Sequence, residues 1–316
     1  MSGKGTIPRR CLGGTGLEVP ALALGGHPLG QADVSDEQAY ETIQCALEWG
    51  IDYFDASPMY GECERRMGTI LADVPRTKIV ISTKTGSHPD RRGDYSWDAT
   101  MWSVENSLKL LRTDHLDIVH VHDPDWLRPG EGLDPVLESR GALEALESLK
   151  AQGTVRAIGL GQQTFELHRI AIESGRFDAI LSFNNYHPVD QSAAEWLFPL
   201  AKERGQGVIN GSPMAHGLLA GDDPDRVIAA RRLPPAAVAM LPAARRFYRW
   251  CRERDLSMPA VVFQFCLRQP LIDLTLTGAK SRTELDENLK AATAPLPDEI
   301  WTDLDALIQE EDDSGR

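Results

Sequence analysis

Cysteine is scarce in this 316-residue chain, and the five cysteines that occur form no recognisable pairing pattern. They are spread between positions 11 and 266, and no C-x-x-C segment is present. Disulfide scaffolds and zinc knuckles need closely spaced, usually even sets of cysteines. We therefore expect neither a disulfide framework nor a structural zinc ion, and a reducing compartment fits the sequence best.

Long apolar runs are also missing, and positive charge is in deficit. No uncharged stretch reaches the roughly 18 residues that a membrane span requires, and residues 1–10 lack the apolar core of a signal peptide. The 33 lysines and arginines stand against 47 aspartates and glutamates, and the net charge of −14 repels phosphate backbones and anionic lipid. These features predict a cytoplasmic protein that binds no nucleic acid and no membrane, and they carry no signal for an oligomeric state.

What the chain does have is the composition of a globular protein and a regular alternation of short apolar runs with amphipathic stretches. Such alternation is typical of βα units around a parallel sheet. The apolar runs predict eight strands, at residues 21–24, 53–55, 79–83, 116–121, 157–160, 179–183, 207–210 and 271–277. The amphipathic stretches predict helices at residues 39–49, 64–72, 100–111, 141–152, 165–174, 193–204, 243–254, 258–268 and 298–309.

This element order favours a closed (β/α)8 barrel, or TIM barrel, over two doubly wound domains. No linker or break in composition divides the chain, so we expect a single domain over residues 1–316. Ser35 with Gln38 forms a capping-box pattern that predicts the start of the first helix. Residues 10–20 predict an N-terminal β-hairpin that closes the barrel floor, and the helices at 243–254 and 298–309 are additional C-terminal helices.

Ionisable residues stand at the ends of three predicted strands, where a barrel places its chemistry. Asp55 ends the second strand, Lys84 follows the third and His122 follows the fourth. An ammonium group at the end of an apolar strand needs a carboxylate partner, which Asp55 on the neighbouring strand would supply. A paired lysine near Tyr60 would lower the pKa of the phenol and make Tyr60 a usable acid or base. The alternative is an ion pair that only fixes the barrel mouth.

These positions resemble the aldo-keto reductase superfamily, whose barrel presents an aspartate, a tyrosine, a lysine and a histidine from the ends of strands two to four. The resemblance rests on three segments in the family's order, which are GIDYFDASPMYGECE at 50–64 with MG at 67–68, ISTKT at 81–85, and LDIVHVHDP at 116–124. It implies that Tyr60 exchanges a proton with the substrate oxygen, tuned by Lys84 and Asp55, while His122 orients that oxygen. Hydride would pass to or from a nicotinamide, and no metal is implied.

The same resemblance implies that NAD or NADP lies across the ends of the later strands, since no credible G-x-G-x-x-G turn offers a Rossmann site. The GSPM segment at 211–214 is similar to the family's strand-seven loop, which meets the pyrophosphate, and TGAKS at 277–281 is similar to its adenosine-phosphate segment. Glu284 stands where many NADP-preferring members carry arginine, and its charge would repel a 2′-phosphate, which favours NAD. The expected cofactor-binding residues are Gly161, Gln162, Gly211, Ser212, Pro213, Met214, Gly217, Thr277, Gly278, Lys280, Glu284 and Asn288.

The chain departs from the family's pattern at the positions that hold the nicotinamide. The Ser-Asn pair after strand five appears here as Gly161-Gln162, and the usual strand-six glutamine falls on Phe183. Gln162 retains an amide that can donate and accept hydrogen bonds. Gly211 replaces the aromatic residue that stacks on the ring in many members, so we expect different ring contacts.

Within the superfamily the chain is most similar to the sugar 1-dehydrogenases that act on L-galactose, L-fucose and D-threo-aldoses. The likeness lies in the Tyr60-Gly61 spacing, the HDP turn at 122–124 and the NGSP loop at 210–213. It implies oxidation of the anomeric hydroxyl to a lactone, with ionised Tyr60 taking the hydroxyl proton. Candidate substrate residues, each of which could instead serve packing or a turn, are His27, Tyr95, Trp97, Asp123 and Trp126.

Other functions remain open at this point. An NADPH-dependent general aldehyde or ketone reductase would run the opposite way with the same four residues. His120 and His122 share one face of a strand and could begin the metal site of a barrel hydrolase, although His120 is more simply a hydrogen-bonded interior residue. Lys84 could form a Schiff base as in barrel aldolases, or the barrel could be a non-catalytic subunit that retains nucleotide.

Overall fold

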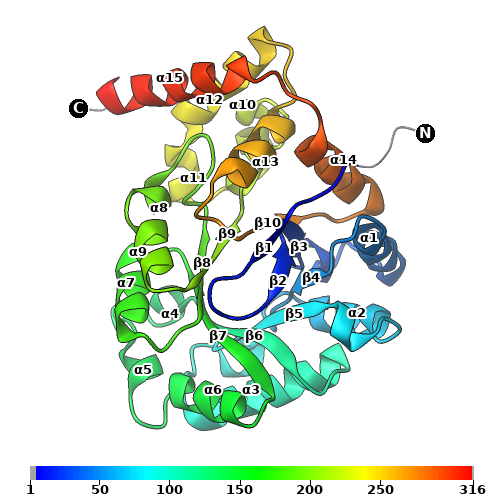
Figure 1. Cartoon of the computed structure of the whole chain (residues 1–316), viewed down its shortest axis with the longest axis vertical. Helices are drawn as coiled ribbons and strands as arrows, with labels where there is room; N and C mark the ends of the chain where they lie inside the picture. The colour runs from blue at the N-terminus through cyan, green and yellow to red at the C-terminus, as the bar shows by residue number, and fades with distance from the viewer. Residues whose placement is uncertain (1–4, 315–316) are drawn as a thin grey trace.

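The computed structural model describes residues 5–314 of the chain, with side chains up to residue 309. Eight parallel strands close into a barrel in the order β10-β3-β4-β5-β6-β7-β8-β9, and the helices surround it (Figure 1). The barrel strands are β3 (Leu22–Gly25), β4 (Tyr53–Asp55), β5 (Val80–Thr85), β6 (Leu116–His122), β7 (Val155–Gln162), β8 (Ala179–Phe183), β9 (Gly207–Gly211) and β10 (Leu274–Gly278). The predicted (β/α)8 barrel is confirmed.

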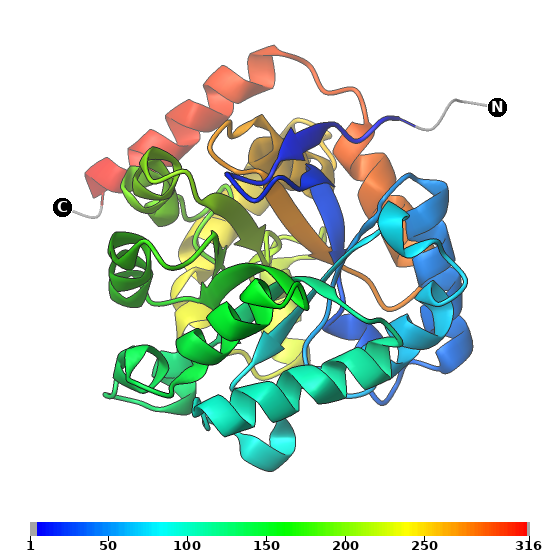
Figure 2. The ribbon, with the colours of Figure 1, turned by 60° about the horizontal axis from the view of Figure 1, so that its bottom comes forward.

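Nine longer helices lie around the barrel among the described residues (Figure 2). They are α1 (Asp36–Glu48), α2 (Cys63–Leu71), α3 (Trp97–Leu111), α6 (Ala142–Ala151), α7 (Phe165–Ser174), α12 (Leu241–Glu253), α13 (Met258–Arg268), α14 (Arg282–Thr293) and α15 (Glu299–Ser314). Short helices fill the connections, namely α4 (Pro124–Leu127), α5 (Asp134–Leu137), α8 (Ser192–Glu195), α9 (Leu197–Glu203), α10 (Pro224–Ala230) and α11 (Pro235–Ala239). None of the described helices is long and apolar enough to cross a membrane.

The start of α1 shows how local sequence sets a helix boundary. The hydroxyl of Ser35 accepts a hydrogen bond from the Gln38 backbone at 3.1 Å, and the Gln38 side chain accepts one from the Ser35 backbone at 2.8 Å. Two backbone donors that a helix start would leave unpaired are therefore satisfied. The predicted capping box is confirmed.

Most predicted elements begin or end a few residues from their observed bounds. The strand predicted at 271–277 begins only at Leu274, because the chain after Pro270 turns, with the Ile272 backbone donating to the Gln269 carbonyl at 3.3 Å. The helix predicted at 193–204 is two helices, α8 and α9, because Trp196 leaves helical geometry with φ −147° and ψ −30°. Helix α14 was missed, since its segment was interpreted only as a cofactor loop. That residues 1–316 form one domain stays a prediction, and residues 1–4 and 315–316 lie outside the described residues.

The predicted N-terminal hairpin covers the barrel floor. Strands β1 (Arg9–Cys11) and β2 (Glu18–Pro20) pair antiparallel, and in Figure 1 they cross the end of the barrel that faces the viewer. The side chain of Leu12 is fully buried against the start of β9, where a Cβ on Gly207 would lie 2.7 Å from it. The hairpin therefore lies at the N-terminal ends of the strands, opposite the ends at which barrel chemistry gathers.

Side chains of β5 alternate between the barrel interior and the helical layer. Thr83 points outward and donates a hydrogen bond of 2.6 Å to the buried carboxyl of Glu64 on α2. Ser82 and Lys84 point inward and both bond to Asp55 of β4. This alternation follows from the two-residue repeat of a strand.

His120 fills the interior below the open end of the barrel. A Cβ on Gly159 of the neighbouring strand would lie 2.1 Å from its ring nitrogen Nδ1, so β7 needs a glycine there. Neither ring nitrogen has a hydrogen-bond partner among the described residues. The predicted interior position of His120 is confirmed, the described residues offer its ring no hydrogen-bond partner, and burial lowers the pKa of the ring well below its usual value.

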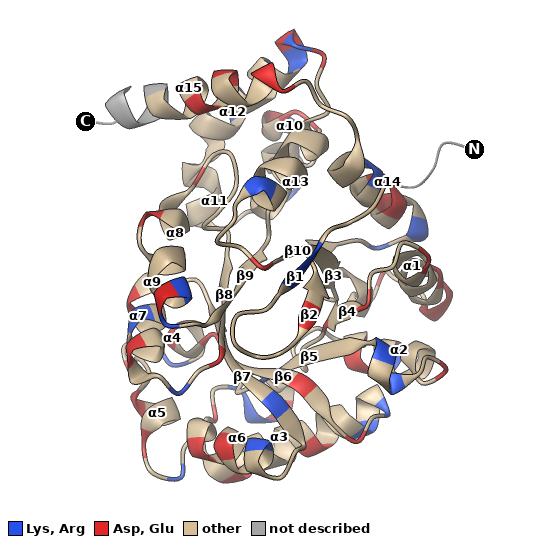
Figure 3. Ribbon diagram, viewed as in Figure 1, with Lys and Arg blue, Asp and Glu red and all other residues tan. Residues whose placement is uncertain are grey.

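Charged residues lie mostly on the outer helices and loops rather than on the barrel strands (Figure 3).

A second apolar cluster joins α12, α13 and α15 to the segment that follows β9. Its members include Leu218, Leu219, Phe247, Trp250, Val261, Ile300 and Leu304. The additional C-terminal helices are thus held by an apolar cluster of their own.

Candidate active site

A cavity of about 400 Å³ opens at the C-terminal ends of the barrel strands. Its volume is within the range of small-molecule sites. Asp55, Tyr60, Lys84 and His122, from β4, the loop after it, β5 and β6, all line this cavity. The structure therefore brings together the four residues that the sequence analysis singled out.

Lys84 is fully buried, and its ammonium group is paired with a carboxylate. Its ammonium donates to Asp55 Oδ2 at 2.7 Å and to the Ala56 carbonyl at 2.8 Å. The other carboxylate oxygen of Asp55 accepts a hydrogen bond from the Ser82 hydroxyl at 2.6 Å. A buried ion pair is stable only when its geometry is good and its remaining polar atoms are bonded, and both conditions are met here.

The ring of Tyr60 lies beside the Lys84 ammonium, but the pKa of Tyr60 shifts in the direction opposite to the predicted one. The Lys84 ammonium stands 5.0 Å from the centroid of the Tyr60 ring, a cation–π distance, while its hydrogen bonds go to Asp55 and Ala56. Burial raises the pKa of Tyr60 well above its usual value, and the charge of Asp55 adds to the effect. The predicted lowering of the Tyr60 pKa by Lys84 is wrong, because burial and the charge of Asp55 raise this pKa.

His122 completes the polar side of the cavity. Its Nδ1 lies 2.8 Å from the Ser87 hydroxyl, its Nε2 lies 3.4 Å from Asp123 Oδ2, and its ring meets that of Tyr60 edge-on at 5.9 Å. Burial, and then the charge of Lys84, lowers the pKa of His122 well below its usual value. The imidazole is therefore neutral at neutral pH. With the Ser87 hydroxyl donating to Nδ1, its Nε2–H is available as a donor.

Asp123 follows His122 in an unusual backbone conformation. Its φ of 45° lies in the left-handed region, which suits aspartate better than most residues and aims the carboxyl at the cavity. Burial raises the pKa of Asp123 to about 7, against a smaller opposing effect of the Lys84 charge. A carboxyl with this pKa changes its protonation state within the physiological range.

The expected cofactor residues divide into two groups. Those that line the cavity are Gly161, Gly211, Ser212, Pro213, Met214, Gly217, Thr277 and Gly278. Gln162, Lys280, Glu284 and Asn288 do not. Lys280 instead pairs with Asp33 at 2.7 Å, and Glu284 accepts from the Lys280 backbone at 2.8 Å. The Asn288 amide donates to the Thr277 hydroxyl at 3.1 Å, so it holds the end of β10.

Of the expected substrate residues, His27 and Asp123 line the cavity, whereas the other three do not. Tyr95 is buried beneath it and donates to the His122 carbonyl at 2.6 Å, so it supports the backbone of the site. Trp126 is 59% exposed, with the Arg92 guanidinium over its ring, and Trp97 opens α3 beside Arg140. These two tryptophans pack against arginines and are not among the residues that line the cavity, so their role in substrate binding stays a prediction.

The sequence did not indicate several residues that line the cavity, notably Asn184 and His216. Phe183 also lines it, although the sequence analysis named this residue only as a departure from the family's pattern. Asn184 is buried in a left-handed conformation with φ 60°, and its amide oxygen has no hydrogen-bond partner among the described residues. Phe183 pairs in register with Gly211 on β9. Phe183 and Asn184 could have been found from their position in the sequence, because both stand at the C-terminal end of a predicted barrel strand.

The H-x-H pair of β6 does not extend into a larger cluster. Within residues 5–314, no group of three or more His, Cys, Asp or Glu side chains is placed to share a metal ion. His120 lies deeper in the barrel than His122, against Gly159.

Comparison with known proteins decides the family. The model of the aldo/keto reductase family matches residues 21–309, which is most of the chain. The chain belongs to the aldo-keto reductase family. As a member, this aldo-keto reductase is an NAD(P)-dependent oxidoreductase.

Individual relatives cover nearly the whole chain. L-galactose dehydrogenase of Arabidopsis thaliana is 29% identical, over 96% of this chain and 95% of its own. D-threo-aldose 1-dehydrogenase of a Pseudomonas species is 30% identical, over 92% and 94%. A solved structure described as an aldo-keto reductase from Pseudomonas aeruginosa superposes with a TM-score of 0.70 at 25% identity, over 92% of this chain and 96% of that one. The barrel of this aldo-keto reductase is thus the fold of the family.

The buried pair generates a prediction about stability. Asp55→Asn leaves the Lys84 ammonium buried without a carboxylate, so we expect the free energy of unfolding to fall by about 3–5 kcal/mol, measured by chemical denaturation. The double variant Asp55→Leu with Lys84→Met removes both charges and should recover most of that loss. Glu105→Gln, which breaks the exposed Glu105–Lys109 pair of α3, is the control and should cost less than about 0.5 kcal/mol. Equal losses in the Asp55 and Glu105 variants would contradict the prediction.

Proposed function

We propose that this aldo-keto reductase oxidises the anomeric hydroxyl of an aldose to a lactone. The observation that carries the proposal is the buried Lys84–Asp55 pair beneath Tyr60, in one cavity with His122. The relatives named for L-galactose and D-threo-aldoses, which match more than nine-tenths of the chain, support a sugar substrate.

The cavity suits a nicotinamide nucleotide. The unpartnered amide oxygen of Asn184 is an acceptor for a carboxamide, in a chain that lacks the family's usual strand-six glutamine. Gly211, Ser212 and Gly217 line one wall and leave room for the close approach of a pyrophosphate. We propose Phe183, beside Gly211, as the aromatic contact that position 211 cannot make. When bound, the nicotinamide accepts or supplies the hydride.

The protein's own residues handle the proton. In the oxidation, the Nε2–H of neutral His122 donates a hydrogen bond to the substrate oxygen and orients it, and the phenolate of Tyr60 takes the hydroxyl proton. Because the pKa of Tyr60 is raised, the phenol must first lose its own proton to solvent. The neutral phenol is the form that donates a proton to a carbonyl oxygen, which favours the second candidate, an aldehyde or ketone reductase using the same residues.

A panel of L- and D-aldoses and small aldehydes, assayed by nucleotide absorbance in both directions, tests the proposal. We expect at least one aldose to be oxidised more efficiently than any aldehyde is reduced. Tyr60→Phe should abolish turnover in both directions and leave nucleotide affinity within about tenfold, or about 1.4 kcal/mol, because it removes only the exchangeable proton. Reduction of aldehydes without oxidation of any aldose would instead establish the second candidate. Full activity of Tyr60→Phe would contradict both.

We propose further that NAD is preferred to NADP. Lys280, the cation expected to meet a 2′-phosphate, is already paired with Asp33, and the Glu284 carboxylate accepts from its backbone. A phosphate there would meet two carboxylates, whose repulsion weakens binding. Fluorescence titration should give a dissociation constant about tenfold lower for NAD, or about 1.4 kcal/mol. Glu284→Gln should bring the dissociation constants for NAD and NADP closer together. Glu287→Gln, on the same helix, should leave their ratio unchanged. Equal affinities for the two nucleotides in the wild-type protein would contradict the preference.

The pKa of Asp123 supports a role in accepting substrate hydroxyl groups. Because this pKa is raised to about 7, the carboxyl is mostly protonated below pH 7 and becomes the stronger acceptor above it. We therefore expect kcat/KM for the aldose to rise as the pH increases through about 7. Asp123→Asn should remove this inflection, whereas Asp125→Asn, whose carboxyl bonds to Thr164 instead, should retain it. An unchanged profile in Asp123→Asn would exclude the carboxyl as its source.

A further inference from the structure

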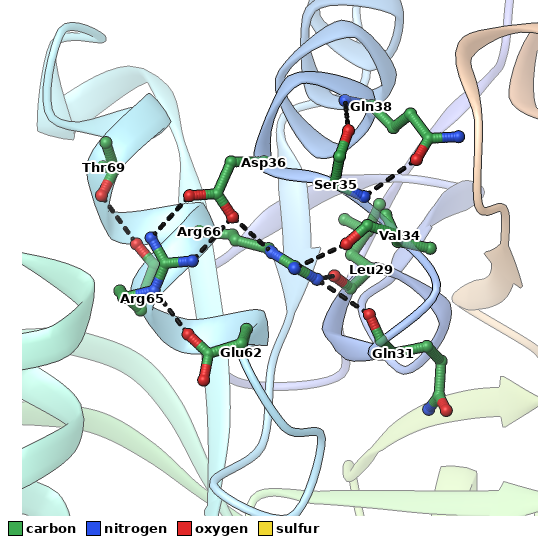
Figure 4. A network of polar contacts seen from close by, with 10 residues as sticks. All are labelled: Leu29, Gln31, Val34, Ser35, Asp36, Gln38, Glu62, Arg65, Arg66 and Thr69. Atoms are coloured by element: carbon green, nitrogen blue, oxygen red, sulfur yellow. Dashed lines mark hydrogen bonds and ion pairs between the residues drawn. The ribbon is translucent and has the colours of Figure 1, made fainter.

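Two adjacent arginines of α2 have very different surroundings (Figure 4). The side chain of Arg66 is 7% exposed, and its guanidinium points into the loop of residues 28–35 that connects β3 to α1. It donates to the backbone carbonyls of Leu29 at 2.5 Å, Gln31 at 3.1 Å and Val34 at 2.6 Å. Arg66 also donates to Asp36 Oδ1 at 2.9 Å, so all of its described bonds tie α2 to this loop and to the start of α1.

Arg65 lies beside Arg66 but stays at the surface. Its side chain is 41% exposed and bonds only to the carboxylates of Asp36 and Glu62. Hydrogen bonds from Arg65, and then from Arg66, lower the pKa of Asp36 to about 2, so that this carboxylate stays ionised at neutral pH. Arg65 contacts no backbone carbonyl of the loop among the bonds described, which makes it a matched comparison for Arg66.

The loop that Arg66 holds forms one wall around Tyr60. Gly30 is so close to Tyr60 that a Cβ there would lie 1.5 Å from the Tyr60 carbonyl oxygen, and the Glu62 backbone donates to the Gly30 carbonyl at 3.2 Å. At the start of the loop, the His27 ring meets the Tyr60 ring edge-on at 5.1 Å. The position of the Tyr60 phenol therefore depends on where this loop lies.

Only an arginine fits this task. Its planar fork of five N–H donors reaches three carbonyls and a carboxylate at once, whereas a lysine is a point charge with three donors at one atom. Without the guanidinium, the carbonyls of Leu29, Gln31 and Val34 lose their bonds to α2. The loop then keeps its local turn bonds, the bond from the Glu62 backbone to the Gly30 carbonyl and the exposed Lys280–Asp33 pair. We expect this smaller set of bonds to hold the loop less firmly against Tyr60.

We propose that Arg66 is a positioning residue for Tyr60, which acts by clamping the 28–35 loop onto α2. The inference rests on the proposed function in so far as Tyr60 is taken as the proton-transfer group. Arg66 itself does not line the cavity. Its loss should therefore affect the alignment of the phenol rather than the space available to substrate and nucleotide.

The first experiment needs no substrate. Hydrogen exchange is measured for unliganded wild type, Arg66→Gln, Arg66→Lys and Arg65→Gln. We expect the amides of residues 28–35 and of Glu62 to exchange at least tenfold faster in Arg66→Gln, with Arg66→Lys intermediate and Arg65→Gln within twofold of wild type. Unchanged exchange in both Arg66 variants, or equal acceleration in Arg65→Gln, would overturn the proposal. If Arg66→Gln does not fold, the exchange rates of Arg66→Lys are compared with those of Arg65→Gln instead, and faster exchange in Arg66→Lys alone supports the proposal.

The second experiment separates positioning from a loss of folded protein. With methylglyoxal, a small reactive aldehyde, and either reduced nucleotide, we expect kcat of Arg66→Gln to fall at least tenfold while the KM for the nucleotide changes less than twofold. The deuterium isotope effect on kcat should rise, because a misaligned phenol makes the chemical step limiting. A fall in kcat with an unchanged isotope effect would indicate only fewer active molecules and would overturn the positioning role. If wild type turns over neither this aldehyde nor any aldose, the proposed function fails, and the role of Arg66 in that function fails with it. The exchange data still decide whether Arg66 clamps the loop.

Discussion

The ion pair between Lys84 and Asp55 is the constraint on which the site depends. Two unit charges are held 2.7 Å apart inside the barrel, and each is bonded to a further polar atom, the Ala56 carbonyl or the Ser82 hydroxyl. Removing charges from water is costly, so such a pair persists only where neighbouring strands fix both partners. Strands β4 and β5 pair in parallel, with Asp55 in register with Ser82, and this pairing sets the distance.

Around this pair, burial drives the other ionisable groups of the cavity toward neutrality. The pKa of Tyr60 is raised, that of His122 is lowered, and that of Asp123 is raised to about 7. Because the lysine and aspartate charges offset each other, the cavity presents mainly uncharged hydrogen-bonding groups below pH 7, and Asp123 gains its charge as the pH rises through about 7. A lining of this kind suits an uncharged polar molecule, such as a sugar ring, better than a charged acid or amine.

The sequence allowed the barrel to be predicted because its apolar runs and helices repeat in order, and it indicated the four cavity residues because they stand at strand ends. It could not show how deeply Tyr60 is buried or that the Asp55 charge lies close enough to act on it, and both raise its pKa. The lowered pKa expected for Tyr60 was wrong for this reason. Trp97 and Trp126 show a second limit, since the sequence does not tell whether a tryptophan that follows a strand lines the pocket or packs against an arginine.

The alternation along β5 links correct folding to the presence of the site. If this strand slipped by one residue against β4, Thr83 would turn into the barrel and the Lys84 side chain would turn outward to α2, where Glu64 lies. Asp55 would then lose its cation, and Glu64 would lose the Thr83 hydroxyl that it now accepts from. A misregistered barrel would thus leave the buried Asp55 carboxylate without a cation, so Lys84 and Asp55, which line the cavity, also select the correct alignment of the sheet as the chain folds.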